Sequence, residues 1–158
     1  MRPKLSPCRS GQTEMFNRRL EDLLDESHEL VKLSLLIDWS MFDRLYDSHY
    51  HPAHGAPALP TRRMVALQLL KYMFDLSDEE LIDRWLENPY WQYFSGESYF
   101  QYRKPCDPSQ LSRWRKRIGE VQLKLILQET IRIAKEQKML SGKNMSEVIV
   151  DTTVQKKI

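Results

Sequence analysis

TRRMVALQLLKYMFDLSDEELIDRWLE, residues 61–87, is the stretch that decides the fold class. Its first half is apolar on most sides of a helical wheel, which is typical of a buried helix from Arg62 to Phe74 with Thr61 as its cap. Ser77 and Glu80, three residues apart, form a capping box that predicts a second helix as far as Glu87. We therefore expect two helices joined by a tight turn, resembling a helix-turn-helix.

The second of these helices is strongly acidic. Six acids against one arginine give residues 75–87 a net charge of −5. A DNA phosphate backbone repels such a surface. We therefore interpret this helix as a scaffold element that does not enter a DNA groove.

The flanking segments extend the helical pattern. Apolar residues at three- and four-residue steps over 16–46 predict one long helix or two end to end, and prolines make residues 49–60 a connector. A further amphipathic helix is expected over 120–138, with Val121, Leu125, Ile126, Ile131 and Ala134 as its apolar residues. The run at 148–150 then reads as a short buried strand ending at Asp151. The fold class expected is mostly α: a multi-helix bundle with a helix-turn-helix-like part, ending in a single strand.

Composition limits the class of protein. At 158 residues the chain is one domain, or one domain with a fragment of another. No apolar run reaches the roughly 18 residues of a membrane span, and the amino terminus lacks the hydrophobic segment of a secretory signal. Cys8 and Cys106 are interpreted as reduced thiols. We expect a cytoplasmic protein without membrane contact, in which residues 1–15 form a flexible tail.

A second stretch, residues 87–119, carries the functional signal. Its second half predicts a helix that begins near Asp107–Ser109 and ends at Ile118, with Leu111, Trp114 and Ile118 as a buried stripe. Between residues 101 and 118, six cations oppose one acid, a local charge of +5 on a chain of net charge +2. Such crowding costs self-repulsion unless an anion relieves it, which favours a polyanion-binding face. The DNA-binding residues predicted are Arg103, Lys104, Ser109, Ser112, Arg113, Arg115, Lys116 and Arg117.

Three other features allow more than one interpretation. The aromatic residues between Tyr90 and Tyr102 could stack unpaired bases, but core packing is the simpler interpretation. Asp151 after a hydrophobic strand resembles a carboxylate of a two-metal site, yet one carboxylate cannot hold two metals, and a turn or cap role is simpler. Three histidines between residues 49 and 54 lack the spacing of a known zinc fold.

Four strings then identify a family resemblance: ALPTRRMVALQLLKYMFDLSDEEL, ENPYWQYFSGESYFQY, PCDPSQLSRWRKRIGE and VIVDTTVQ. Together they resemble the amino-terminal region of bacterial insertion-sequence transposases of the insertion-sequence-five group, which are DDE-type recombinases. The resemblance extends from about Leu20 to Gln155, with Ser95 where the family often has Cys.

The resemblance implies a helical DNA-binding domain, residues 16–140, followed by the first strand of a ribonuclease-H-like catalytic domain, residues 145–158. Asp151 would be the first acid of an incomplete catalytic triad and a Mg²⁺ ligand only when the full catalytic domain is present. The chain alone would bind double-stranded DNA at terminal inverted repeats, associated with the bacterial nucleoid, and would lack strand-transfer activity. The alternatives are assembly with a separately made carboxyl-terminal piece, and a helical module that inhibits full-length transposase by mixed oligomerisation.

Overall fold

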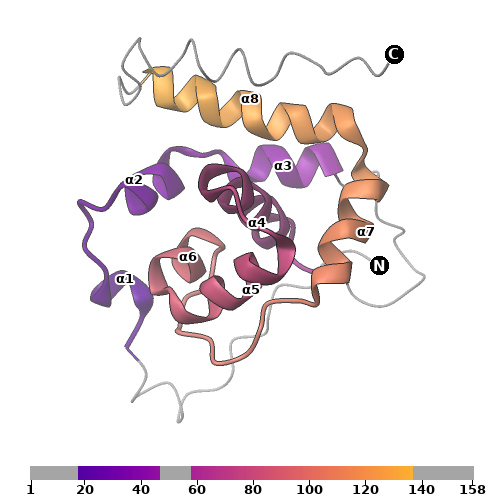
Figure 1. The fold of residues 1–158 in the computed structure, drawn as a ribbon. Coiled ribbons are helices and arrows are strands. Elements are labelled where there is room, and N and C mark those ends of the chain that lie inside the picture. The colour runs from indigo at the N-terminus through magenta and orange to yellow at the C-terminus, as the bar shows by residue number, and fades with distance from the viewer. Residues whose placement is uncertain (1–17, 47–57, 137–158) are drawn as a thin grey trace.

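The computed structural model describes residues 18–46 and 58–136, and these residues are mostly helical, as predicted (Figure 1). No strand occurs within these two ranges. The helices are α1 Leu20–Leu23, α2 Glu29–Leu36, α3 Trp39–Tyr46, α4 Thr61–Phe74, α5 Asp78–Glu87, α6 Pro89–Phe94, α7 Pro108–Ile118 and α8 Glu120–Glu136. The predicted tail at 1–15, the strand at 148–150 and Asp151 lie outside the described residues.

Helix α4 lies at the centre of the bundle, and every residue from Met64 to Leu70 is buried. It packs against α3, α5 and α8; in Figure 1, α3 and α8 lie above α4 and α5 lies below it. A helix enclosed in this way must be apolar on most of its sides, as the sequence indicates. The expected cap at Thr61 is wrong: α4 begins at Thr61 itself, and the cap position is Pro60, which offers no side-chain hydrogen bond.

The short connection from α4 to α5 agrees with the sequence. Asp75 adopts the left-handed conformation, with φ of 48°, and its backbone N–H donates to the carbonyl of Lys71. Ser77 then caps α5, and both hydrogen bonds of the capping box with Glu80 are present. Three residues therefore connect the two helices, and α5 starts at Asp78.

The segment before the connector corrects the prediction of one long helix or two. Three short helices form instead, because polar side chains cap new helices inside the apolar pattern. The His28 side chain accepts from the backbone N–H of Leu30 and begins α2. Asp38 accepts from the N–H groups of Ser40 and Met41 at the start of α3. Apolar spacing alone does not reveal such breaks.

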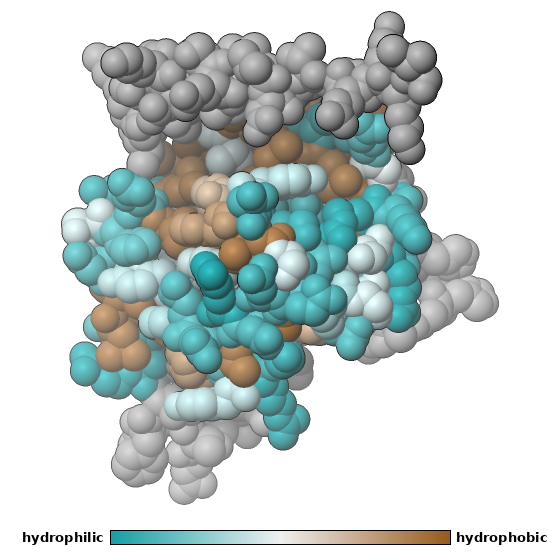
Figure 2. Space-filling view, in the orientation of Figure 1, coloured by the Kyte–Doolittle hydropathy of each residue, from teal (hydrophilic) through white to brown (hydrophobic). Residues whose placement is uncertain are grey.

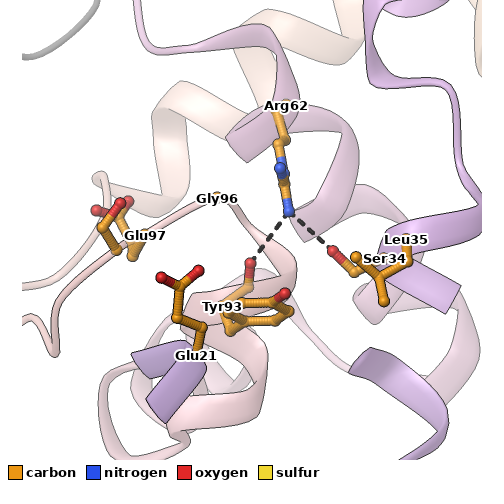
Figure 3. Close-up of a pocket in the computed structure, with 8 residues that line it drawn as sticks. Glu21, Ser34, Leu35, Arg62, Tyr93, Gly96 and Glu97 are labelled. Carbon is orange, nitrogen blue, oxygen red and sulfur yellow. Dashed lines mark hydrogen bonds between the residues drawn. The ribbon is translucent and has the colours of Figure 1, made fainter. Parts of the chain in front are cut away.

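Arg62 joins three parts of the fold. Its guanidinium donates to the Ser34 hydroxyl at 2.8 Å and to the Tyr93 carbonyl at 3.3 Å (Figure 3). It also lies over the Trp39 ring, 4.7 Å from the ring centroid. Burial lowers the pKa of Arg62 from its usual range. The side chain thus ties the first turn of α4 to α2, α3 and the end of α6.

The aromatic stretch after Asn88 forms a helix that the sequence does not predict. Asn88 accepts from the N–H groups of Tyr90 and Trp91, and Pro89 occupies the first turn, so α6 starts directly after α5 ends. Trp91 and Phe94 are buried. Their packing, with Tyr90 partly buried against the same core, confirms the core interpretation for these three rings but not for Tyr102, which is 83% exposed.

Helix α8 confirms the predicted element but corrects the assignment of its apolar face. Ile126 and Ile133 are buried, whereas Val121 is 68% exposed and Leu125 is 39% exposed. Ile126 packs with the core because α8 crosses α4, while Val121 and Leu125 lie one turn apart on the outer side. None of the helices in the described ranges could span a bilayer, since each is too short or too polar.

Candidate nucleic-acid interface

The candidate interface is built on α7, whose ends are defined by strong local signals. Asp107 accepts from the N–H of Ser109, and the Gln110 side chain completes a capping box. Pro108 occupies the first turn, where its missing N–H costs nothing. Gly119, with φ of 86°, ends the helix. The pKa of Asp107 is lowered by hydrogen bonds from Ser109, of which the side-chain bond has the larger effect and the backbone bond the smaller. The capping carboxylate therefore stays charged.

The inner side of α7 confirms the predicted stripe. Leu111, Trp114 and Ile118 are all buried. The Trp114 ring meets the Tyr46 ring edge-on at 5.8 Å, and the Tyr46 hydroxyl donates to the carbonyl of Gln122 at 3.2 Å. This packing fixes α7 against α3 and the start of α8, so the side chains on its outer side are held by a rigid element.

Four of the predicted cations are exposed and form no ion pair within the described residues: Arg103, Arg113, Lys116 and Arg117. The Arg113 guanidinium donates to the Ser109 hydroxyl at 2.7 Å, so these two predicted residues lie together on the outer face. We call these four cations the outer cations. Most of the surface toward α7, at right in Figure 2, is hydrophilic.

Arg115 corrects the prediction, because it is turned inward. Its guanidinium pairs with both carboxylate oxygens of Asp78, at 2.9 Å and 2.5 Å. The Ser112 hydroxyl donates to the same carboxylate, and so does the ammonium of Lys71 at 2.8 Å. Arg115 and Ser112 therefore hold α7 to the start of α5 and are not available to a phosphate in this arrangement.

Asp78 is the centre of this cluster. Its side chain is only 12% exposed. Burial raises its pKa, but the hydrogen bonds and charges of Arg115 and Lys71 outweigh burial and lower the pKa to about 2. In the folded protein Asp78 therefore stays ionised well below the pH at which a free aspartate is protonated.

Lys104 also forms an ion pair with an acid. Its ammonium lies 2.5 Å from the Asp83 carboxylate, and both side chains are more than half exposed. An exposed pair of this kind is weak, about 0–1 kcal/mol, and does not prevent the lysine from reaching another anion. The two acids Asp78 and Asp83 both lie on α5, which fits the interpretation of α5 as a scaffold.

Sequence reasoning missed Gln92 of α6, which is fully buried. Its side-chain amide accepts from the N–H of Gln101 at 2.6 Å and donates to the Gln101 carbonyl at 3.0 Å. The glutamine thereby fixes the loop that leads into α7. A polar residue inside the aromatic stretch was the available signal, since a buried amide needs partners.

A shallow cavity of about 190 Å³ lies elsewhere, beside Arg62 and Glu97 (Figure 3). Its charged groups are already satisfied, because Arg62 binds Ser34 and Tyr93, and Glu97 pairs with Arg63. Within the described ranges no three His, Cys, Asp or Glu side chains cluster as metal ligands would. The predicted ligand Asp151 is outside those ranges, so its role stays a prediction.

Comparison with known proteins agrees with the resemblance in its broad outline. A family model described as a transposase domain, DUF772, matches residues 18–117, which include α1 to α6 and nearly all of α7. The chain is also 42% identical over 157 residues to an uncharacterized protein of Rhizobium meliloti, ORF8 in the nfe locus. That match spans 99% of this chain and 74% of the relative. No solved structure matches the chain. The chain belongs to the DUF772 transposase domain family.

Proposed function

We propose that this chain binds double-stranded DNA through the outer face of α7, as the end-binding part of an insertion-sequence transposase of the DDE type. The observation that carries the proposal is the group of outer cations, Arg103, Arg113, Lys116 and Arg117, which are exposed without an acidic partner among the described residues. Phosphate contacts supply most non-specific DNA affinity, and Arg and Lys are the residues that make them.

The anchoring of α7 favours a DNA-binding role for this helix over a role as a charged surface helix that contacts only solvent. Three buried side chains on the inner side and the Asp78 cluster fix the helix in two directions. A rigid helix presents its outer side chains in one register, as recognition of a groove or a phosphate row requires.

The proposal is tested by removing three outer cations together, in an Arg113→Ala, Lys116→Ala, Arg117→Ala variant. Each lost phosphate contact lowers the slope of log K against log salt by about 0.9, so this slope should fall by roughly 2.7. Fluorescence anisotropy with a labelled duplex containing a terminal inverted repeat, at several salt concentrations, measures it. Far-UV circular dichroism checks that the variant is folded.

A matched control removes the same charge elsewhere. Arg44, Lys124 and Arg132 each pair with an acid, and their triple alanine variant has an identical net charge. This control should bind DNA with nearly the wild-type slope. Equal losses in both variants would show a general charge effect and refute the assignment to α7.

A second candidate function is association with another transposase chain through α8. It is favoured by the exposed apolar pair Val121 and Leu125, which lie one helical turn apart. Apolar association is insensitive to moderate salt, unlike DNA binding. Sedimentation with the full-length transposase at two salt concentrations separates the two functions. Salt-independent complexes without DNA affinity would support this alternative.

A further inference from the structure

The loop between α6 and α7 presents an aromatic ring and a cation side by side. Tyr102 is 83% exposed, and its neighbour Arg103 is exposed as well. A single exposed aromatic residue on a protein surface needs no explanation. The Tyr102 ring differs from such a residue because the loop that carries it is held in place both before and after the exposed residues.

The fixation before Tyr102 comes from the buried amide of Gln92. It makes hydrogen bonds to both the N–H and the carbonyl of Gln101, and also donates to the carbonyl of Leu86 at 3.2 Å. Burying an amide is costly unless its donors and acceptors are satisfied, so this side chain holds the backbone of residue 101 in one place.

The fixation after Arg103 is equally defined. Pro105 and Cys106, the two residues after Lys104, are buried. Tyr102, Arg103 and Lys104 therefore project between two anchored points. The Phe100 ring meets the Tyr102 ring edge-on at 5.1 Å and restricts its orientation, while leaving most of its surface open.

This projecting segment adjoins the cationic face of α7. Asp107 caps α7, and the charges of both Arg113 and Lys104 act on its carboxylate. Lys104 of the loop and the first turns of α7 therefore lie close to one another. A DNA strand that follows the outer cations of α7 would reach Tyr102 and Arg103 at the amino-terminal end of the helix.

We propose that Tyr102 and Arg103 form a stacking site for an unpaired nucleobase at the end of a DNA duplex. The Tyr102 ring stacks on the base, and the Arg103 guanidinium contacts the adjoining phosphate. An exposed aromatic ring beside a cation is the combination by which proteins hold single-stranded nucleic acid. This site rests on the proposed function, because the duplex part of the same DNA lies on α7.

The test compares two DNA probes: a blunt duplex, and the same duplex with a short single-stranded extension. Wild type should bind the extended probe more tightly. Tyr102→Ala should lose this preference by roughly 10-fold in Kd for the extended probe, and change blunt-duplex binding less than about twofold. Tyr102→Phe, which keeps the ring, should retain the preference. Tyr72→Ala removes another exposed tyrosine, on α4, and should behave as wild type.

The outcomes separate this proposal from the one before it. If wild type binds the blunt duplex with a steep salt dependence but shows no preference for the extension, the stacking site is wrong and duplex binding stands. Equal weakening of both probes by Tyr102→Ala also overturns it, because the tyrosine would then be a duplex contact. If wild type binds neither probe, the proposed function itself fails.

Discussion

Replacing Asp78 with Asn tests the polar anchor of α7. The substitution keeps the shape and some hydrogen-bonding capacity of the side chain but removes its charge. Arg115 and Lys71 would then lose the carboxylate that neutralises them at 2.5–2.9 Å. The fold lowers the pKa of Asp78 from its ordinary value of 3.8 to about 2. At 1.36 kcal/mol for each pKa unit, ionisation contributes about 2 kcal/mol to the free energy of unfolding.

The sign of the pH dependence follows from this shift. The pKa of Asp78 is lower in the folded state than in the unfolded chain. Its contribution is therefore complete above about pH 5 and is lost as the pH falls from about 4 towards 2. By pH 3 about half of it, roughly 1 kcal/mol, should be gone. Asp78→Asn has no such group, so the difference between wild type and variant should shrink over the same interval.

Urea unfolding followed by tryptophan fluorescence measures this difference at pH 7, 5, 4 and 3. The matched control is Asp83→Asn, the same substitution on the same helix, whose partner Lys104 is exposed. That variant should lose at most about 0.5 kcal/mol, as exposed pairs usually do. A loss below about 0.5 kcal/mol for Asp78→Asn at pH 7, or a loss independent of pH, would refute the reasoning.

Two further predictions concern Gly96 and Cys106. Gly96→Ala should destabilise the fold by about 2 kcal/mol in chemical denaturation, because φ is +92° and the new Cβ would lie 2.9 Å from Cδ of Arg62. The loss of stability should be smaller in an Arg62→Ala background. Equal losses in both backgrounds would contradict the contact. Cys106 should react with iodoacetamide at pH 8 on the order of 100-fold more slowly in the folded than in the urea-unfolded protein, since burial raises its pKa to about 11. A Cys8→Ser variant ensures that only Cys106 is alkylated. Equal rates in the folded and unfolded protein would show that the thiol is accessible and refute the prediction.

Local signals predicted the parts of the fold that depend on neighbouring residues. The capping box at Ser77 and Glu80 and the stripe of Leu111, Trp114 and Ile118 are where the sequence places them. Each depends on residues within one or two helical turns, so periodicity and cap chemistry are sufficient. The same reasoning failed for 16–46 because His28 and Asp38 cap new helices inside a continuous apolar pattern.

The inward position of Arg115 could not be read from α7 alone. Its partner Asp78 is 37 positions away and on another helix. A helical wheel places Arg115 beside the apolar stripe but does not show what that side of the helix meets. The available signal was the opposite charge of two segments, −5 over residues 75–87 and +5 over 101–118. Their attraction predicts contact, although it does not identify the pair.

The ion pairs between α5 and the cationic segment also bear on whether DNA can bind beside an acidic helix, whose charge would repel phosphate. Two α5 acids, Asp78 and Asp83, are neutralised by Arg115 and Lys104. The remaining exposed acids at 75, 79, 80 and 87 would repel phosphate from α5 and confine a duplex to the outer side of α7. Charge reversal of Glu79 and Glu87 to lysine, which leaves the capping box of Ser77 and Glu80 intact, should then increase non-specific DNA affinity without changing the fold. Unchanged affinity would mean that α5 lies too far from the DNA path to restrict it.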